Sequence, residues 1–375
     1  MRPWLLASGD FVPIGGMDSA NHALASYLAR RGEGAVHLVA HRVSSDLSAQ
    51  PSIHVHRVPR PFGLHSLGEP LLTRIATRRA REVRAAGGHV VANGGNVDAG
   101  DISWVHYVHA AYEPSAAGAL NSAIVATRYR RYVAAERRAL TRARVIVCNS
   151  ARTVDDVVDC VGVDPTRVRR VYYGIDPVRF HPQRDSAGAK AALGYDAARP
   201  VVLFVGALGD RRKGFDTLFS AWCDLCGVSS WDAQLLVAGS GAELGAWRAR
   251  AVRRDVANRM RFLGYRTDVP ALMAAADLIV HPARYEAYGL GVHEALCCGV
   301  PAVVSASAGV AERFPDDLRP LLLQEVESVA ELTSRLRTWR DAMDSFRDRA
   351  VAFSVGLGAR TWDDMSRDIA AMAES

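Results

Sequence analysis

The sequence predicts an α/β protein with two Rossmann-like domains, each built on a doubly wound parallel sheet. Short β-branched runs alternate with longer amphipathic stretches along the 375 residues, as in chains of βα units with helices on both sheet faces. The series restarts at a strong strand candidate, Val201–Val205, after a stretch at 176–200 that contains Pro, Asp and Gly. The chain is also too long for one ordinary hydrophobic core.

The expected elements follow one another in order. Strand candidates of the first half are the short apolar runs at 3–7, 36–40, 53–58, 90–92, 104–108 and 145–149. Those of the second half are the runs at 201–205, 234–238, 261–263, 278–281 and 302–305. Helical periodicity fills the intervals between them, for example at 19–31, 121–143, 214–225 and 328–343.

We therefore predict an N-terminal domain over residues 1–175 and a C-terminal domain over 176–354. Two such domains leave a cleft between them. Open parallel sheets bind ligands at the C-terminal ends of their strands, so the residues that follow strands are the first candidates for a site.

Charge is unevenly distributed. Residues 1–175 carry a net charge of +8 and residues 176–375 a net charge of −2. The basic half suggests an anionic partner, either a phosphorylated acceptor or a membrane surface. Residues 71–86 place Arg74, Arg78 and Arg81 on one helical face and apolar residues on another, which suits peripheral contact with anionic lipid; the alternative is an ordinary basic, solvated face.

Several classes of protein are disfavoured. No stretch approaches the ~18 apolar residues of a membrane-spanning helix, and Asp10 comes too early for a signal peptide. The six cysteines include one C-x-x-C pair with nothing nearby to complete a zinc site. We expect a cytoplasmic protein with reduced thiols and no nucleic-acid partner, and peripheral contact with the inner face of the membrane is the alternative to a freely diffusing one.

The most informative stretch is 276–311, which reads as strand, glycine-bearing loop, helix, strand and second glycine loop. Glycines there let a diphosphate approach the backbone, and a helix that starts at Leu290 would offer it N–H donors. Glu286 in the loop could face a sugar hydroxyl. Glu294 in the helix could accept hydrogen bonds from ribose hydroxyls. The alternative is two solvated glutamates.

A second stretch, 202–222, runs from a strand into a loop that holds Arg211, Arg212 and Lys213. Cations at the end of a strand would neutralise a diphosphate leaving group, whereas an exposed basic turn is the alternative. The loop is not a P-loop, because the Gly-Lys-Ser/Thr ending is missing.

Two weaker features lie in the first half. Gly15 and Gly16 follow the first strand and precede a helix, which suits either backbone contact with a substrate or a tight turn. His106 and His109 lie at or near the end of a strand. Either could bond a sugar hydroxyl across the cleft or be a structural histidine.

These motifs together resemble the family 4 retaining glycosyltransferases, which have the two-domain GT-B architecture. The resemblance spans nearly the whole chain. It rests on the E-x7-E block from Glu286 to Glu294, the following Gly-Val-Pro at 299–301, and four further blocks at 147–153, 172–182, 204–214 and 262–277.

The resemblance implies that Glu286 contacts the donor sugar and Glu294 the ribose. It implies that Lys213 and a nearby arginine hold the diphosphate, that Gly16 lies under the donor, and that His109, or else His106, is the strand-end histidine. The catalytic set is thus Glu286, His109 and Lys213. The complete expected donor-binding set is Gly16, Gly206, Arg211, Arg212, Lys213, Tyr265, Tyr288, Gly289, Leu290 and Glu294.

One position departs from the family pattern. Ala207 stands where the family usually has Arg, so Arg211 or Arg212 would supply the guanidinium. The family's C-terminal helix normally crosses back onto the N-terminal domain, and we expect the same of residues 355–375.

The expected reaction is transfer of a hexose-type sugar from a nucleotide diphosphate, UDP by default and GDP as the competitor. The acceptor is a glycan, a lipid-linked molecule or a natural product. No Asp-x-Asp pair occurs, so we expect no metal requirement and no cofactor beyond the nucleotide sugar. The alternatives are a sugar-nucleotide epimerase on the same fold and a non-catalytic nucleotide-sugar-binding protein.

Overall fold

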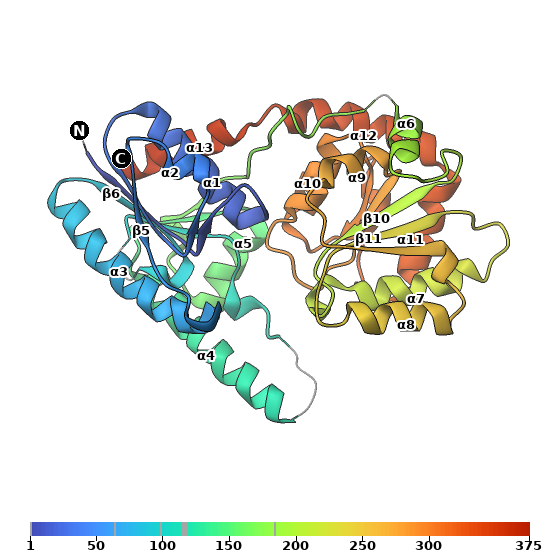
Figure 1. The fold of residues 1–375 in the computed structure, drawn as a ribbon, viewed down its shortest axis with the longest axis horizontal. Coiled ribbons are helices and arrows are strands. Elements are labelled where there is room, and N and C mark those ends of the chain that lie inside the picture. The colour runs from blue at the N-terminus through green and yellow to red at the C-terminus, as the bar shows by residue number, and fades with distance from the viewer. Residues whose placement is uncertain (1, 64, 98–99, 115–118, 184) are drawn as a thin grey trace. The chain divides into compact units, whose positions relative to one another are not determined.

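The computed structural model describes residues 2–63, 65–97, 100–114, 119–183 and 185–375. It divides into two compact units: unit 1 comprises Met1–Gly174 with Arg360–Ser375, and unit 2 comprises Ile175–Ala359. Each unit has one main parallel sheet flanked by helices (Figure 1), which confirms the predicted fold class. The division after Gly174 is one residue from the predicted one. The returning C-terminal segment starts at Arg360, whereas the prediction had it start at 355.

The sheet of unit 1 has seven parallel strands in the order β5-β3-β1-β6-β7-β8-β9. Their bounds are β1 (Trp4–Ala7), β3 (Val36–Ala40), β5 (Ile53–Arg57), β6 (His89–Asn93), β7 (Ile102–Val105), β8 (Val145–Cys148) and β9 (Val168–Arg170). The central strand β1 is buried along its whole length, as expected of a strand covered on both faces. A two-stranded sheet pairs β2 (Asp10–Phe11) with β4 (Arg42–Val43).

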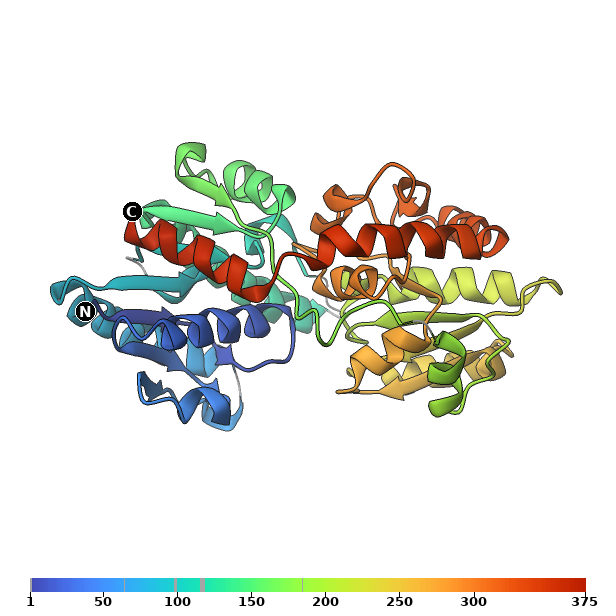
Figure 2. The same cartoon turned by 90° about the horizontal axis from the view of Figure 1, so that it is seen from above.

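The described residues of unit 1 form six α-helices. They are α1 (Gly16–Arg31), α2 (Ser45–Ser48), α3 (His65–Ala85), α4 (Ala119–Arg142), α5 (Ala151–Asp156) and α13 (Trp362–Glu374). The C-terminal helix α13 lies alongside α1 (Figure 2). It is capped by Thr361, whose side chain accepts a hydrogen bond from the backbone N–H of Asp364. An ion pair of 2.5 Å between Arg30 and Asp363 joins the two helices.

The sheet of unit 2 has six parallel strands in the order β12-β11-β10-β13-β14-β15. Their bounds are β10 (Val201–Val205), β11 (Gln234–Ala238), β12 (Met260–Gly264), β13 (Leu278–His281), β14 (Ala302–Ser305) and β15 (Leu322–Leu323). The helices are α6 (Ser186–Ala192), α7 (Phe215–Cys226), α8 (Leu244–Arg253), α9 (Val269–Ala275), α10 (Leu290–Cys297), α11 (Val329–Asp341) and α12 (Met343–Gly358). One hydrophobic core joins these elements.

The change of direction in the strand order lies between β10 and β13, which are hydrogen-bonded neighbours although 73 residues separate Val205 from Leu278. Loops that follow neighbouring parallel strands meet at the same edge of the sheet. The loops after β10 and β13 are the two that the sequence singled out. Within the described ranges no helix is both long and apolar enough to cross a bilayer.

Candidate active site

The loop after β10 is held against the segment that follows β13. It ends in a short 3₁₀ helix, Arg211–Lys213, and then in Gly214, whose φ is 69°. A Cβ atom at Gly214 would lie 1.9 Å from the carbonyl oxygen of Pro282. Only glycine permits both this φ and this approach, and the approach brings Lys213 to the end of β13.

Lys213, Glu286 and His281 form one cluster at that edge. The ammonium of Lys213 donates to Oε2 of Glu286 at 2.6 Å, and Nε2 of His281 lies 2.8 Å from the same oxygen. Burial alone would raise the pKa of Glu286, but Lys213, the hydrogen bond from His281 and the charge of Arg212 hold it well below the usual range. Glu286 is therefore ionised, and it takes one of the three donors of the lysine.

Arg212 belongs to this cluster, whereas Arg211 points elsewhere. Nη1 of Arg212 donates to the carbonyl of Tyr285 at 3.1 Å and lies 3.9 Å from Glu286, and its side chain is 19% exposed. The side chain of Arg211 is 61% exposed and pairs with Asp216 at 3.3 Å. The geometry thus favours Arg212 as the guanidinium near Lys213.

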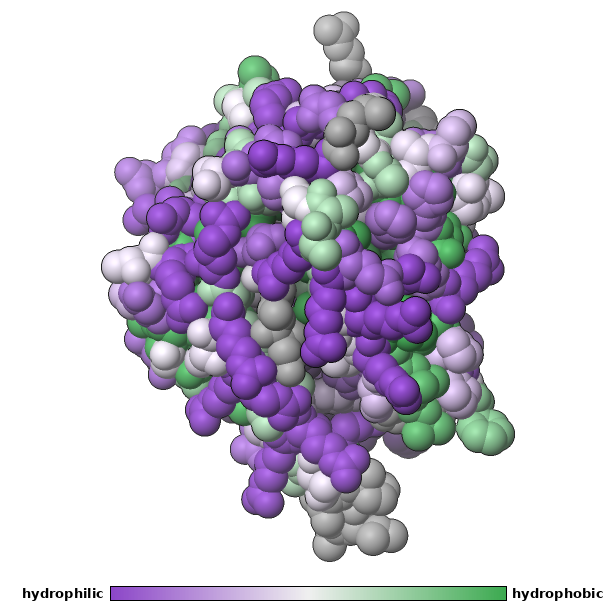
Figure 3. Space-filling view, turned by 90° about the vertical axis from the view of Figure 1, so that its left-hand side faces the viewer, coloured by the Kyte–Doolittle hydropathy of each residue, from purple (hydrophilic) through white to green (hydrophobic). Residues whose placement is uncertain are grey.

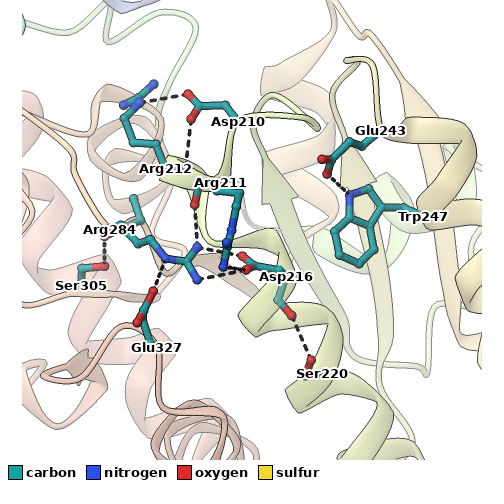
Figure 4. A network of polar contacts seen from close by, with 11 residues as sticks. Asp210, Arg211, Arg212, Asp216, Ser220, Glu243, Trp247, Arg284, Ser305 and Glu327 are labelled. Atoms are coloured by element: carbon teal, nitrogen blue, oxygen red, sulfur yellow. Dashed lines mark hydrogen bonds and ion pairs between the residues drawn. The ribbon is translucent and has the colours of Figure 1, made fainter. Parts of the chain in front are cut away.

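Arg284 holds the loop after β10, which contains Arg211, Arg212 and Lys213, in place (Figure 4). Its guanidinium donates to both carboxylate oxygens of Asp216, at 2.8 and 3.0 Å, to Glu327 at 2.7 Å, and to the carbonyl of Arg211 at 2.6 Å. Its backbone N–H donates to the carbonyl of Arg212 at 2.8 Å. The hydrogen bonds to Asp216 and Glu327 raise the pKa of Arg284 above its ordinary value despite burial. The position of Lys213 is therefore fixed by hydrogen bonds outside the cluster.

The N-terminus of α10 supplies further donors. The helix starts after Gly289, whose φ is 103°, and no side chain caps it. The N–H groups of Leu290 and Gly291 consequently have no partner within the helix, and the helix dipole adds positive potential there. A Cβ atom at Gly289 would lie 3.4 Å from Cγ of Glu286, so these donors adjoin the cluster. Two cations and a helix N-terminus together suit a diphosphate.

Glu294 lies on α10 and is partly exposed. Among the described residues, none forms a hydrogen bond with its carboxyl group. Burial raises its pKa to about 8, and the charge of Arg179 opposes this only in part. A carboxyl group in such an environment gains from a ligand that donates hydrogen bonds to it.

Three further residues of the expected donor-binding set lie in unit 2. Gly206 follows β10 and packs near the Lys213 side chain, since a Cβ atom there would lie 3.6 Å from Cγ of Lys213. Tyr265 follows β12 and is 62% exposed, so its ring is available to stack on a ligand. Tyr288 is oriented differently from Tyr265. Its side chain is 2% exposed and its hydroxyl lies 2.5 Å from Nδ1 of His293, so the ring belongs to the core.

The two histidines of unit 1 have different surroundings. His109 lies in a 3₁₀ helix after β7, and its side chain is 41% exposed. Buried Glu136 accepts hydrogen bonds from the backbone N–H of His109 at 2.9 Å and from its Nδ1 at 3.1 Å, which leaves Nε2 as an acceptor. His106 packs on Trp104, and its Nδ1 lies 2.5 Å from the hydroxyl of Tyr173. Burial lowers the pKa of His106 to about 3. The geometry favours His109 as the ligand-facing histidine.

Gly16 is the first residue of α1 and belongs to unit 1. It follows Gly15, whose φ of 86° places that residue in the region that favours glycine. Nearby Asp18 has a carboxylate oxygen, Oδ1, that is buried without a hydrogen-bond partner. Its pKa is raised to about 6, mainly by burial and then by Asp10.

Sequence reasoning missed three residues of these clusters: His281, Arg284 and Glu136. His281 is the last residue of β13, so the rule that ligands bind at strand ends could have selected it. Arg284 lies two residues before Glu286 in the same motif, but its partners are distant in the sequence. Glu136 lies in a helix rich in arginine, where the sequence suggests that an acidic residue forms an ion pair on the surface. Within the described ranges no group of three or more His, Cys, Asp or Glu side chains is placed to hold a metal ion.

Family models match both halves of the chain. The model described as Glycosyltransferase Family 4 matches residues 14–179, and the one described as Glycosyl transferases group 1 matches residues 199–339. A D-inositol 3-phosphate glycosyltransferase of Salinispora tropica is 30% identical over 351 residues, which cover 85% of this chain and 72% of that protein. The chain belongs to the family 4 glycosyltransferases, and the resemblance found in the sequence is confirmed.

Solved structures agree on the fold. WaaG, a glycosyltransferase involved in lipopolysaccharide biosynthesis, has a TM-score of 0.79 at 22% identity, with 99% of both chains covered. HepE of Anabaena, in complex with UDP and glucose, has a TM-score of 0.72 at 20% identity, with 100% of both chains covered. The fold is accordingly GT-B, as the resemblance implied.

Proposed function

We propose that the chain is a retaining enzyme that transfers a hexose-type sugar from a UDP-sugar, with a GDP-sugar as the competing donor. The single observation that carries this is the Lys213–Glu286 pair beside the uncapped N-terminus of α10. Transfer breaks the bond between the anomeric carbon and the β-phosphate oxygen, so negative charge grows on the leaving diphosphate. Preorganised donors at that point stabilise the transition state more than the ground state.

Each residue of the cluster then has a role. Lys213 and Arg212 bind the diphosphate together with the first N–H groups of α10. Glu286 accepts a hydrogen bond from a hydroxyl of the donor sugar, and Glu294 accepts from the ribose. His109 bonds a sugar hydroxyl through Nε2. For retention, the acceptor hydroxyl attacks on the face that the phosphate leaves, and the departing phosphate oxygen takes its proton.

We further propose that no metal ion is needed. Lys213 and Arg212 converge on one carboxylate at 2.6 and 3.9 Å, and the same two cations can neutralise a diphosphate in the way a bridging metal would. Glu286 engages one of the three N–H donors of the Lys213 ammonium, so the other two stay available to a phosphate oxygen.

The acceptor is proposed to be a glycan, a lipid-linked molecule or a natural product, and an anionic one is favoured. Residues 1–175 carry a net charge of +8, and the Salinispora relative is named for a phosphorylated inositol. We place the reaction in the cytoplasm, with peripheral contact at the inner face of the membrane as a proposal that follows from the same charge.

A panel of nucleotide sugars tests the proposal. The protein is incubated with each donor, first alone and then with candidate acceptors, and free nucleoside diphosphate is measured. Slow hydrolysis of one donor class, accelerated by an acceptor, is the expected result, and NMR of the product should show the anomeric configuration of the donor. Conversion of the sugar without any acceptor would instead identify an epimerase. Nucleotide binding without turnover would identify a binding protein.

A further inference from the structure

A groove rich in arginine lies between α3 and α4 of unit 1. It encloses about 730 Å³, within the range of ~300–1,000 Å³ typical of small-molecule sites. Six arginines line it: Arg74, Arg78, Arg81, Arg128, Arg131 and Arg138. Figure 3 views this end of unit 1, and hydrophilic side chains cover much of the face it shows.

The arginines converge because of their spacing. Arg74, Arg78 and Arg81 recur at intervals of four and three along α3, and residues at such intervals share one face of a helix. Arg128, Arg131 and Arg138 recur at intervals of three and seven along α4. Two rows of guanidinium groups therefore line one hollow. The choice of arginine over lysine does not by itself indicate a phosphate site, because the chain has only two lysines. The placement of the two rows is the evidence for a site.

These cations have few counter-ions. Among the described residues, the one ion pair recorded for the six is that of Arg78 with Glu82, at 3.1 Å and largely exposed. Among the described residues that line the groove, Glu69 alone carries a carboxyl group, and burial raises the pKa of that group. Arg84, which does not line the groove, has its own carboxylate at 2.9 Å in Asp101. All six side chains are exposed, so solvent and salt screen their mutual repulsion, and an anion in the hollow would be attracted by both rows.

The inner end of the groove reaches the edge of the sheet where ligands bind. Gly95 lines it and lies in the 3₁₀ helix Gly94–Asn96, directly after β6. A Cβ atom at Gly95 would lie 3.1 Å from Cβ of Ala135, so glycine lets α4 pack close over the strand ends. Tyr132 also lines the groove, and its ring centroid lies 5.3 Å from that of His109.

We propose that the groove between α3 and α4 binds the phosphate groups of the acceptor, and that these groups carry at least two negative charges. Guanidinium groups bind phosphate oxygens in bidentate fashion, and six of them exceed what one phosphate needs. The contact between Tyr132 and His109 connects the groove to the histidine assigned to a sugar hydroxyl. The identification of the ligand as the acceptor rests on the proposed function, whereas the binding of phosphate in the groove does not.

Calorimetric titration with inorganic tripolyphosphate tests the groove directly. UDP at saturation occupies the donor site during the titration. The double variant Arg74→Gln/Arg131→Gln removes one guanidinium from each helix, and both side chains are exposed, so folding should persist. The matched control is Arg130→Gln/Arg253→Gln, which removes the same charge at exposed positions outside the groove. The groove variant should weaken tripolyphosphate binding by at least about tenfold, whereas the control should stay within about twofold.

Equal binding by wild type and groove variant would overturn the proposal, and so would an equal loss in both double variants, which would indicate non-specific attraction. Flotation with phosphatidylcholine vesicles, with and without phosphatidate, then identifies the source of the phosphate. Flotation of wild type that needs phosphatidate and is lost in the groove variant indicates a lipid headgroup. Tripolyphosphate binding without flotation indicates a soluble phosphorylated acceptor. If neither UDP nor GDP binds, the proposed function fails, but the comparison of variants still decides the groove.

Discussion

The ammonium of Lys213 lies 2.6 Å from a carboxylate oxygen of Glu286, although 73 residues separate them in the sequence. The pair exists because Gly214 lets the loop after β10 approach Pro282 and because Arg284 holds that loop in place. A lysine with one donor engaged and a fixed stem is preorganised to receive a phosphate.

Replacing Lys213 should therefore affect turnover strongly. We expect Lys213→Ala to cost roughly 3–4 kcal/mol of transition-state stabilisation, as for loss of one preorganised donor. Lys213→Arg should recover only part, because a planar fork places its charge differently. The measurement is kcat/KM with one donor, with the melting temperature of each variant as a control for the uncompensated charge of Glu286. A loss within about twofold, or ~0.4 kcal/mol, would show that this loop does not hold the diphosphate.

The two neighbouring arginines should behave differently. Arg212→Ala should lower kcat/KM by about a hundredfold, near 2.7 kcal/mol, because its guanidinium adjoins Glu286 at 3.9 Å. Arg211→Ala should lower it by no more than about threefold, since an exposed pair such as that with Asp216 contributes little. Arg211→Ala serves as the charge-matched control. If Arg211 proved the more important, then the guanidinium that replaces the family's arginine would be the exposed one.

The two glutamates of the E-x7-E block should separate in kinetics. Glu286→Gln should chiefly lower kcat, by at least about tenfold, because its carboxylate is assigned to the reacting sugar. Glu294→Ala should chiefly raise KM for the donor, since a ribose contact is similar in ground and transition states. Steady-state kinetics with a single donor measures both. The reverse pattern would mean that the roles are exchanged.

Activity should survive chelation. Cations of the protein are assigned to the diphosphate, so dialysis against EDTA should leave kcat/KM for the donor within about twofold. The same sample with added magnesium or manganese is the control. Loss of activity in EDTA that either metal restores would refute the assignment of Lys213 and Arg212 as the diphosphate's main counter-charges.

Much of the fold follows from local pattern, but the meeting of distant groups does not. Strands such as β10 and β13 were predictable because they are continuous apolar runs bounded by turns. The strands β9 and β15 were missed because three and two residues are too short for a periodic signal. The run at 104–108 was predicted too far along the chain. β7 spans Ile102–Val105, so the prediction began two residues late and ended three residues late.

The candidate site shows the same limit. The motifs pointed to Glu286, Lys213 and Glu294, but the choice of Arg212 over Arg211 required knowing which side chain faces the end of β13. Tyr288 belongs to the expected donor-binding set, but the sequence did not show which way its side chain points. Its ring packs into the core beside His293, and no local pattern gives the direction of a loop side chain. His281 needed the sheet edge to be known first.

The carboxyl group of Glu294 should release a proton when UDP binds. Its pKa is raised to about 8 by burial, so in the free protein it is largely protonated at pH 7. Ribose hydroxyls that donate to the carboxylate favour its ionised form and lower the pKa on binding. UDP binding at pH 7 should therefore release a fraction of a proton. Calorimetry of UDP binding in two buffers of different ionisation enthalpy measures this release, and Glu294→Gln should abolish it.

The raised pKa of Glu294 should also make the stability of the ligand-free protein depend on pH. Between about pH 4.5, the ordinary value, and about pH 8, the folded protein retains a proton at Glu294 that the unfolded chain has lost. The contribution of this group to the free energy of unfolding thus falls as the pH rises through that interval. Glu294→Gln, which stays neutral, should gain melting temperature relative to wild type from pH 5 to pH 8. A constant difference across that range would show that Glu294 titrates normally, and the proton release on UDP binding should then vanish as well.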